Sequence, residues 1–122
     1  MTSLTKRDNF PSVDIDDKGV FKYVLIELYE TDPDNEEKSK LLVRGRRSAE
    51  YHADIYEPEE ERVLKVGLDC QCLGGGRIQH DPNYIKVYGY SLGYGKADHT
   101  KTVALLKEKY PNYKIEWSDE GY

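Results

Sequence analysis

The chain has 122 residues, of which 34% are charged and 38% hydrophobic, and its formal net charge at pH 7 is -5. This length fits a single domain, residues 1–122, and the acidic balance argues against nonspecific nucleic-acid binding. No apolar run is as long as the roughly 20 residues that cross a bilayer, and the N-terminal segment MTSLTKRDNF lacks the apolar core of a secretion signal. We therefore expect a cytoplasmic protein that binds neither nucleic acid nor membrane, with residues 1–12 flexible.

The clearest predicted strand covers residues 20–29, which are rich in β-branched and aromatic residues. Apolar residues occupy both alternating sets of positions around Leu25, so both faces of this strand are apolar. A strand buried on both faces is typical of a central position in a sheet covered by helices. The acidic residues 30–38 predict a solvated loop, and residues 40–45 predict a returning strand.

A first helix is predicted to begin at Ser48, a favourable N-cap residue, and to run through Tyr56. Pro58 disfavours helical geometry at the residue before it. We therefore expect this helix to stop or kink at Glu57.

The second half of the chain contains several shorter predicted elements. Residues 66–72 and 85–91 are predicted strands, linked through a glycine run and a short strand around Ile78. A second helix is predicted over 100–110 and a last strand over 115–117. Two helices among roughly six strands predict one α+β domain, with both helices packed on a mixed sheet.

His52 is the first candidate for chemistry, because a helix beginning at Ser48 would place it near the positive end of the helix dipole. This field and the preceding arginines disfavour the imidazolium, which keeps the ring neutral near physiological pH. A neutral imidazole can attack phosphorus or take a proton from water. The alternative is a structural histidine that packs against Tyr51 and Tyr56 with both ring nitrogens hydrogen-bonded.

Two glycine-bearing segments can present backbone amides to an anion. Residues 73–77 hold three glycines that can adopt positive φ and end in Arg77, although a flexible hairpin connector explains them equally well. In residues 89–93, Ser91 and the following amides can form an anion-binding nest. The same segment matches the G-x-S-x-G pattern of serine hydrolases, but the chain is too short and its acid and histidine follow in the wrong arrangement. No GxxxxGK[ST] phosphate loop is present.

Among the cations, Lys22 and Arg77 are expected to point inward, because each borders an apolar or glycine-rich segment. Most of the others, Arg44 among them, are expected at the surface. Cys70 and Cys72 are too close in sequence for an unstrained disulfide and are predicted to be reduced packing residues. A metal site built from them and a histidine is a further alternative, although no strong ligand spacing is present.

Segments spread over almost the whole chain resemble one protein family. They are VDIDDKGVFKYVLI (13–26), VRG (43–45), AEYHADIY (49–56), CQCLGGGRI (70–78), KVYGYSLGYGKADH (86–99) and the closing WSDEGY (117–122). Together, and with comparable spacing, they resemble the Janus family. The resemblance implies a small α+β monomer that removes phosphate from histidine, and sometimes lysine, side chains of proteins without a metal ion or other cofactor.

The resemblance also implies roles for individual residues. His52 matches the catalytic residue, acting as nucleophile or general base, and Lys22 matches the phosphate-binding lysine. The backbone cradle matches Ser91, Leu92 and Gly93, and the supporting arginine matches Arg77. The amide of Ala53, near the start of the predicted helix, is expected to bind the same phosphate. Gly93 departs from the family pattern, in which alanine is common, but both residues are small and offer an amide. The expected partners are phosphohistidine-containing proteins, and the alternative function is a non-catalytic phosphoprotein-binding regulatory module.

Overall fold

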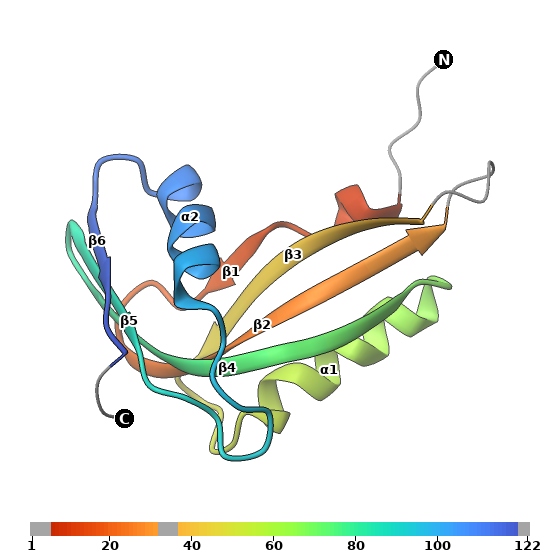
Figure 1. Cartoon of the computed structure of the whole chain (residues 1–122), viewed down its shortest axis with the longest axis horizontal. Helices are drawn as coiled ribbons and strands as arrows, with labels where there is room; N and C mark the ends of the chain where they lie inside the picture. The colour runs from red at the N-terminus through yellow and green to blue at the C-terminus, as the bar shows by residue number, and fades with distance from the viewer. Residues whose placement is uncertain (1–5, 32–36, 120–122) are drawn as a thin grey trace.

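The computed structural model describes residues 6–31 and 37–119, which form a six-stranded sheet with the order β1-β3-β2-β4-β5-β6 and two α-helices (Figure 1). The strands are β1 (Val13–Ile15), β2 (Gly19–Thr31), β3 (Glu37–Arg46), β4 (Asp69–Asp81), β5 (Tyr84–Tyr88) and β6 (Lys114–Trp117). The helices are α1 (Ala53–Lys65), α2 (His99–Lys109) and the 3-10 helix η1 (Lys6–Asn9). The central strands are antiparallel, and the edge strands β1 and β6 each pair in parallel. The predicted α+β domain with a mixed sheet is confirmed.

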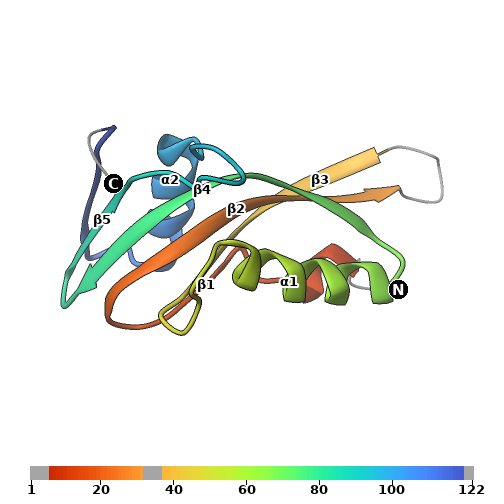
Figure 2. The same cartoon turned by 90° about the horizontal axis from the view of Figure 1, so that it is seen from below.

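Strand β2 lies in the middle of the sheet and contributes to both of its hydrophobic clusters, as its apolar faces predict. Tyr23 and Leu25 pack into the cluster that contains Val103 and Leu106 of α2. The alternate residues of β2 pack into the cluster that contains Val63 of α1. The two helices therefore cover opposite faces of the sheet (Figures 1 and 2).

The prediction that the first helix begins at Ser48 is wrong. Helix α1 begins at Ala53, and Ser48 lies in the turn that follows β3. The start is marked instead by Asp54, whose carboxylate accepts a hydrogen bond from the Tyr51 amide at 2.8 Å. This bond satisfies an amide near the start of the helix in the way that a capping box does.

The expected stop or kink before Pro58 is also wrong, because α1 continues through this residue to Lys65. The proline removes one backbone donor from the helix. The buried residues Ile55, Glu59 and Val63 lie on either side of it and pack the same helix face against the sheet. Tertiary packing outweighs the local preference here.

The glycine run is not a connector between two strands. All of residues 73–77 lie within β4, a single strand that pairs with β2 from end to end with one irregularity beside Leu25 and Ile26. The predicted strand over 85–91 is shorter, ending at Tyr88. The predicted helix over 100–110 and the last strand are confirmed as α2 and β6.

The described part of the predicted flexible N-terminus is folded onto the sheet. The Lys6 and Arg7 amides donate hydrogen bonds to the Glu30 carboxylate, and Phe10 is buried. Residues 1–5, and residues 32–36 of the predicted acidic loop, lie outside the described residues. Neither α-helix of the described chain is long and apolar enough to cross a membrane.

Candidate functional site

A cavity of about 450 Å³ opens where the first turn of α1, strand β2 and the β5–α2 loop meet. Figure 1 shows this loop beside the start of α1 at the lower edge of the molecule. The cavity is lined by Lys22, Tyr51, His52, Ala53, Ser91, Leu92, Gly93 and Tyr94. Six of the seven predicted site residues therefore share one cavity, although they come from three separate segments.

Arg77, the seventh predicted residue, is not among those that line the cavity. It lies in β4 directly opposite Lys22 of β2. Residues opposite each other on neighbouring strands project to the same face of the sheet. Arg77 and Lys22 are therefore neighbouring positive charges on the sheet face that carries α1.

The His52 ring is held by one nitrogen. Its Nε2 lies 2.9 Å from the carbonyl oxygen of Gly76. A carbonyl can only accept, so Nε2 carries the hydrogen and the lone pair of the neutral ring is on Nδ1. No hydrogen bond among the described residues involves Nδ1 of His52, so the alternative of a histidine with both nitrogens satisfied does not describe this ring.

Burial is the main cause that lowers the pKa of His52 below its ordinary value. The residue is 6% exposed. Its bond to the Gly76 carbonyl opposes this effect, while the charges of Lys22 and Arg77 add to it. The ring is therefore neutral at physiological pH, as the sequence predicts, with desolvation rather than the helix dipole as the leading cause.

Two glycines of β4 allow imidazole rings to approach both faces of the strand. A Cβ atom on Gly75 would lie 2.6 Å from Cδ2 of His52, and one on Gly76 would lie 2.8 Å from Cε1 of His99. Successive residues of a strand face opposite sides, which explains why the two rings are on opposite faces. Glycine inside a strand is a known sign of close approach by another group, so the glycine run itself is the sequence signal for these two contacts.

His99 is a site-supporting residue that sequence reasoning missed. Its Nε2 donates to the Gly89 carbonyl at 2.9 Å, and its Nδ1 accepts from the Tyr23 hydroxyl at 2.6 Å. Burial raises the pKa of Tyr23, so this hydroxyl keeps its proton. Thr102 completes the chain, 3.0 Å from the same hydroxyl. The buried network fixes the point where the β5–α2 loop leaves the sheet.

The serine turn (91–95) is closed by its own hydrogen bonds. Ser91 and Gly95 exchange two backbone hydrogen bonds, and the Ser91 hydroxyl accepts from the Tyr94 amide at 3.1 Å. The Ser91 amide is therefore engaged, which revises the expectation that it faces an anion. The amides of Leu92 and Gly93 donate no hydrogen bond to any described residue and remain available.

The arginines before α1 do not belong to this cavity. Arg44 was expected at the surface, but it is 2% exposed and its Nε donates to the Glu59 carboxylate at 3.0 Å. Arg46 forms an ion pair with Asp14 at 2.9 Å. These ion pairs link β3 to α1 and to β1, so they have a structural role.

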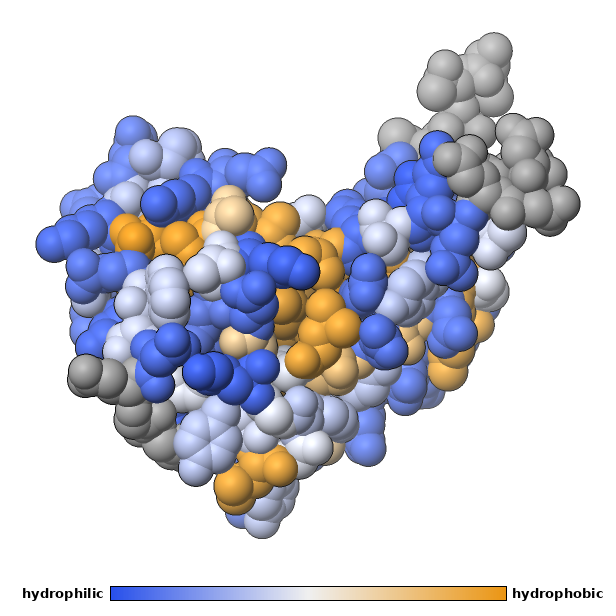
Figure 3. All heavy atoms as spheres, viewed as in Figure 1, coloured by the Kyte–Doolittle hydropathy of each residue, from blue (hydrophilic) through white to orange (hydrophobic). Residues whose placement is uncertain are grey.

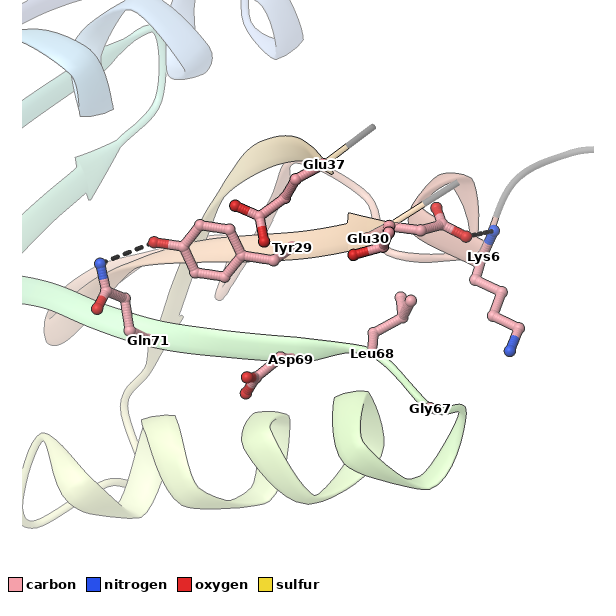
Figure 4. Close-up of a pocket in the computed structure, with 9 residues that line it drawn as sticks. Lys6, Tyr29, Glu30, Glu37, Gly67, Leu68, Asp69 and Gln71 are labelled. Atoms are coloured by element: carbon pink, nitrogen blue, oxygen red, sulfur yellow. Dashed lines mark hydrogen bonds between the residues drawn. The ribbon is translucent and has the colours of Figure 1, made fainter. Parts of the chain in front are cut away.

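A second cavity, of about 560 Å³, lies beside the last residues of β2 and the first residues of β4 (Figure 4). Its lining includes the carboxylates of Glu30, Glu37 and Asp69, with Lys6 as the only cation among its described lining residues. This balance of charge is unfavourable for a phosphate. The His52 cavity is therefore the candidate site for an anionic substrate.

The described residues contain no group of three or more His, Cys, Asp or Glu side chains that could hold a metal ion. Cys70 and Cys72 are free, which confirms that they form no disulfide. Of the two histidines outside the cavity, His99 has both ring nitrogens engaged, and Nδ1 of His80 bonds the Asp16 carbonyl. The arrangement gives no support to the metal-site alternative.

Comparison with known proteins agrees with the resemblance noted in the sequence. The Janus/Ocnus family model matches residues 7–114. The chain belongs to the Janus/Ocnus family. It is 50% identical to the 14 kDa phosphohistidine phosphatase of Sus scrofa, with 100% of each chain covered. It is 55% identical to the sex-regulated protein janus-A of Drosophila pseudoobscura pseudoobscura, over 92% of this chain and 77% of the relative. It is 52% identical to janus-A of Drosophila melanogaster, over 92% of this chain and 82% of the relative.

Proposed function

We propose that this Janus/Ocnus family member is a protein phosphohistidine phosphatase with His52 as its catalytic residue. The observation that carries the proposal is the His52 ring, which shares one cavity with Lys22 and with two unengaged amides of a distant turn. The full-length likeness to the porcine phosphohistidine phosphatase supports the choice of substrate. The likeness to the janus-A proteins supports the family alone, because their name specifies no reaction.

The phosphoryl group of the substrate binds to backbone amides of Ala53, Leu92 and Gly93. The Ala53 amide is at the first position of α1, where helix amides have no partner within the helix. Lys22 contributes a positive charge inside the cavity, and Arg77 strengthens it from the neighbouring strand. Phosphoryl transfer depends mostly on position and on fixed positive charge, which these groups provide without a metal ion.

Nδ1 of His52 is the reactive atom. As a nucleophile, its lone pair forms a bond to phosphorus while the bond from phosphorus to the substrate imidazole breaks, and the leaving imidazole takes up a proton. Water then hydrolyses the phosphorylated His52. As a general base, Nδ1 instead accepts a proton from the water that attacks phosphorus, while the bond from phosphorus to the substrate imidazole breaks and this imidazole takes up a proton. Both routes need Nε2–H held by Gly76, since this bond keeps the lone pair on Nδ1.

The enzyme acts as a monomer in this proposal, because every group invoked comes from one chain. The proposal also places the enzyme in the cytoplasm. The two free cysteines support this location, because thiols persist in reducing compartments. The competing proposal is a phosphoprotein-binding module that keeps the anion site but does not turn over its ligand.

The deciding experiment compares phosphate release from a phosphohistidine-containing protein by the wild type, His52→Ala and His52→Gln. Glutamine can place an N–H donor near the position of Nε2, which preserves the bond to Gly76 while Nδ1 is lost. We expect both variants to lose at least about 10²-fold in rate, the lower range for losing a positioned acid–base or nucleophilic group. Thermal unfolding would verify that His52→Gln is folded. Equal release by all three proteins, or none by any, would remove the enzyme proposal.

A further inference from the structure

Two large apolar side chains stand at the mouth of the His52 cavity. Tyr51 is 63% exposed and Leu92 is 87% exposed, and both line the cavity. Tyr51 precedes α1 and Leu92 lies in the β5–α2 loop, so the two side chains come from different walls. Figure 3 shows hydrophobic atoms at the lower tip of the molecule, over this loop. We name Tyr51 and Leu92 the apolar rim.

Single exposed apolar residues are common on soluble proteins and need no explanation. The apolar rim differs because its two members flank one cavity, on a chain with 34% charged residues. Nothing within the described chain covers Leu92, whose side chain is almost wholly exposed. An apolar pair that borders an anion-binding cavity indicates a ligand with a charged group next to apolar groups.

We propose that the apolar rim binds apolar side chains that flank the phosphohistidine of a protein substrate. This inference rests on the proposed phosphatase function. A phosphohistidine within a protein cannot enter the cavity alone, because its chain neighbours must pass over the cavity mouth. Tyr51 and Leu92 stand on two walls of that mouth, so the residues next to the phosphohistidine contact them.

The cavity and the apolar rim therefore divide recognition between them. The amides and Lys22 bind the phosphoryl group, which is the same in every substrate, whereas the apolar rim distinguishes one flanking sequence from another. Leu92 takes part in both, because its amide is unengaged in the cavity and its side chain forms the rim. Contact between a substrate residue and this side chain fixes the turn that presents the amide.

Two synthetic phosphohistidine peptides test the apolar rim, one with leucine on both sides of the phosphohistidine and one with serine there. The quantity measured is the ratio of their kcat/KM values. We expect about a tenfold preference of the wild type for the leucine peptide. Leu92→Ser and Tyr51→Ser should each bring the ratio close to one, whatever they do to the absolute rates. Leu64→Ser is the matched control, because Leu64 is 54% exposed but does not line the cavity, and it should keep the wild-type ratio.

The outcomes separate this inference from the proposed function. Turnover of both peptides at equal kcat/KM would overturn the apolar rim and leave the phosphatase intact. A ratio that survives in both rim variants, or falls equally in Leu64→Ser, would also overturn it. If no peptide is turned over, the phosphatase proposal fails, and the ratio of the two peptide Kd values then tests the apolar rim by itself. Self-association abolished by Leu92→Ser would assign the surface to a second copy of the chain instead.

Discussion

The state of the His52 ring is set by its immediate neighbours. The Gly76 carbonyl fixes the hydrogen on Nε2, and burial with two nearby cations disfavours a second proton on Nδ1. A histidine whose pKa lies below its ordinary value is predominantly neutral at pH 7. The lone pair that the proposed reaction needs is thus present without a separate base to generate it.

Replacing Lys22 with methionine tests this arrangement through the pH dependence of turnover. Activity requires the neutral ring, so kcat/KM should rise with pH through the His52 pKa and level off, with the acidic limb below about pH 6.5. Lys22→Met removes a charge that lowers this pKa, so the limb should move to higher pH and KM should increase. The control is Lys101→Met, at an exposed position of α2. An acidic limb that does not move, or moves equally in the control, would contradict the assigned electrostatics.

At the scale of elements, β4 positions the site because three of its residues lack side chains. Gly75 accommodates His52 on the α1 face, and Gly76 accommodates His99 on the α2 face. The same Gly76 provides the carbonyl that holds His52. Through His99, the strand is also connected to Gly89, where the β5–α2 loop begins. Two segments of the candidate site are therefore positioned against a single strand.

Gly75→Ala should disturb the site from within β4. The added Cβ would lie 2.6 Å from Cδ2 of His52 and 2.7 Å from the Tyr23 carbonyl oxygen, so the ring or the strand must shift. We expect a loss of about 1–3 kcal/mol of stability, as for other overpacked interiors, together with reduced turnover. Gly93→Ala is the matched control for stability, because its Cβ would meet no atom within 4 Å. Thermal unfolding measures the stability of both variants. An unchanged unfolding midpoint for Gly75→Ala would contradict the close packing around Gly75.

The whole molecule is organised around one sheet that serves two hydrophobic clusters. The central strand β2 gives Tyr23 and Leu25 to the α2 side and Val24 and Ile26 to the α1 side. All four of these side chains are fully buried. Both clusters contain residues of β2, so loss of packing in one cluster also disturbs the strand on which the other cluster is built.

This shared strand predicts that both faces unfold together. Val63→Ala would weaken the α1 cluster and Leu106→Ala the α2 cluster, since both residues are fully buried. We expect each to lower a single unfolding midpoint, with Leu106→Ala costing about 2–5 kcal/mol, while far- and near-UV circular dichroism transitions remain coincident. Two separated transitions in either variant would mean that the faces unfold independently.

Much of this fold follows from patterns that act over a few residues. The β-branched and aromatic residues of β2, with apolar side chains at both alternating sets of positions, predict this strand and its burial on both faces, and helical spacing predicts α2. Family motifs, compared over the whole chain, predict a site at His52, Lys22 and the serine turn. These features depend on local patterns or on resemblance to a family. They can therefore be predicted from the sequence without knowledge of contacts between distant residues.

The remaining features depend on contacts between residues far apart in the chain. The passage of α1 through Pro58 is decided by packing of the helix against the sheet, which outweighs local preference. The glycine run forms a strand because β2 provides its hydrogen-bond partners, and its lack of side chains serves two rings that arrive from other elements. Likewise, the pairing of Arg44 with Glu59, which lie on different elements, arises only after folding. A hydrogen bond or close contact between distant residues leaves no periodic signal in the sequence, so tertiary structure alone determines it.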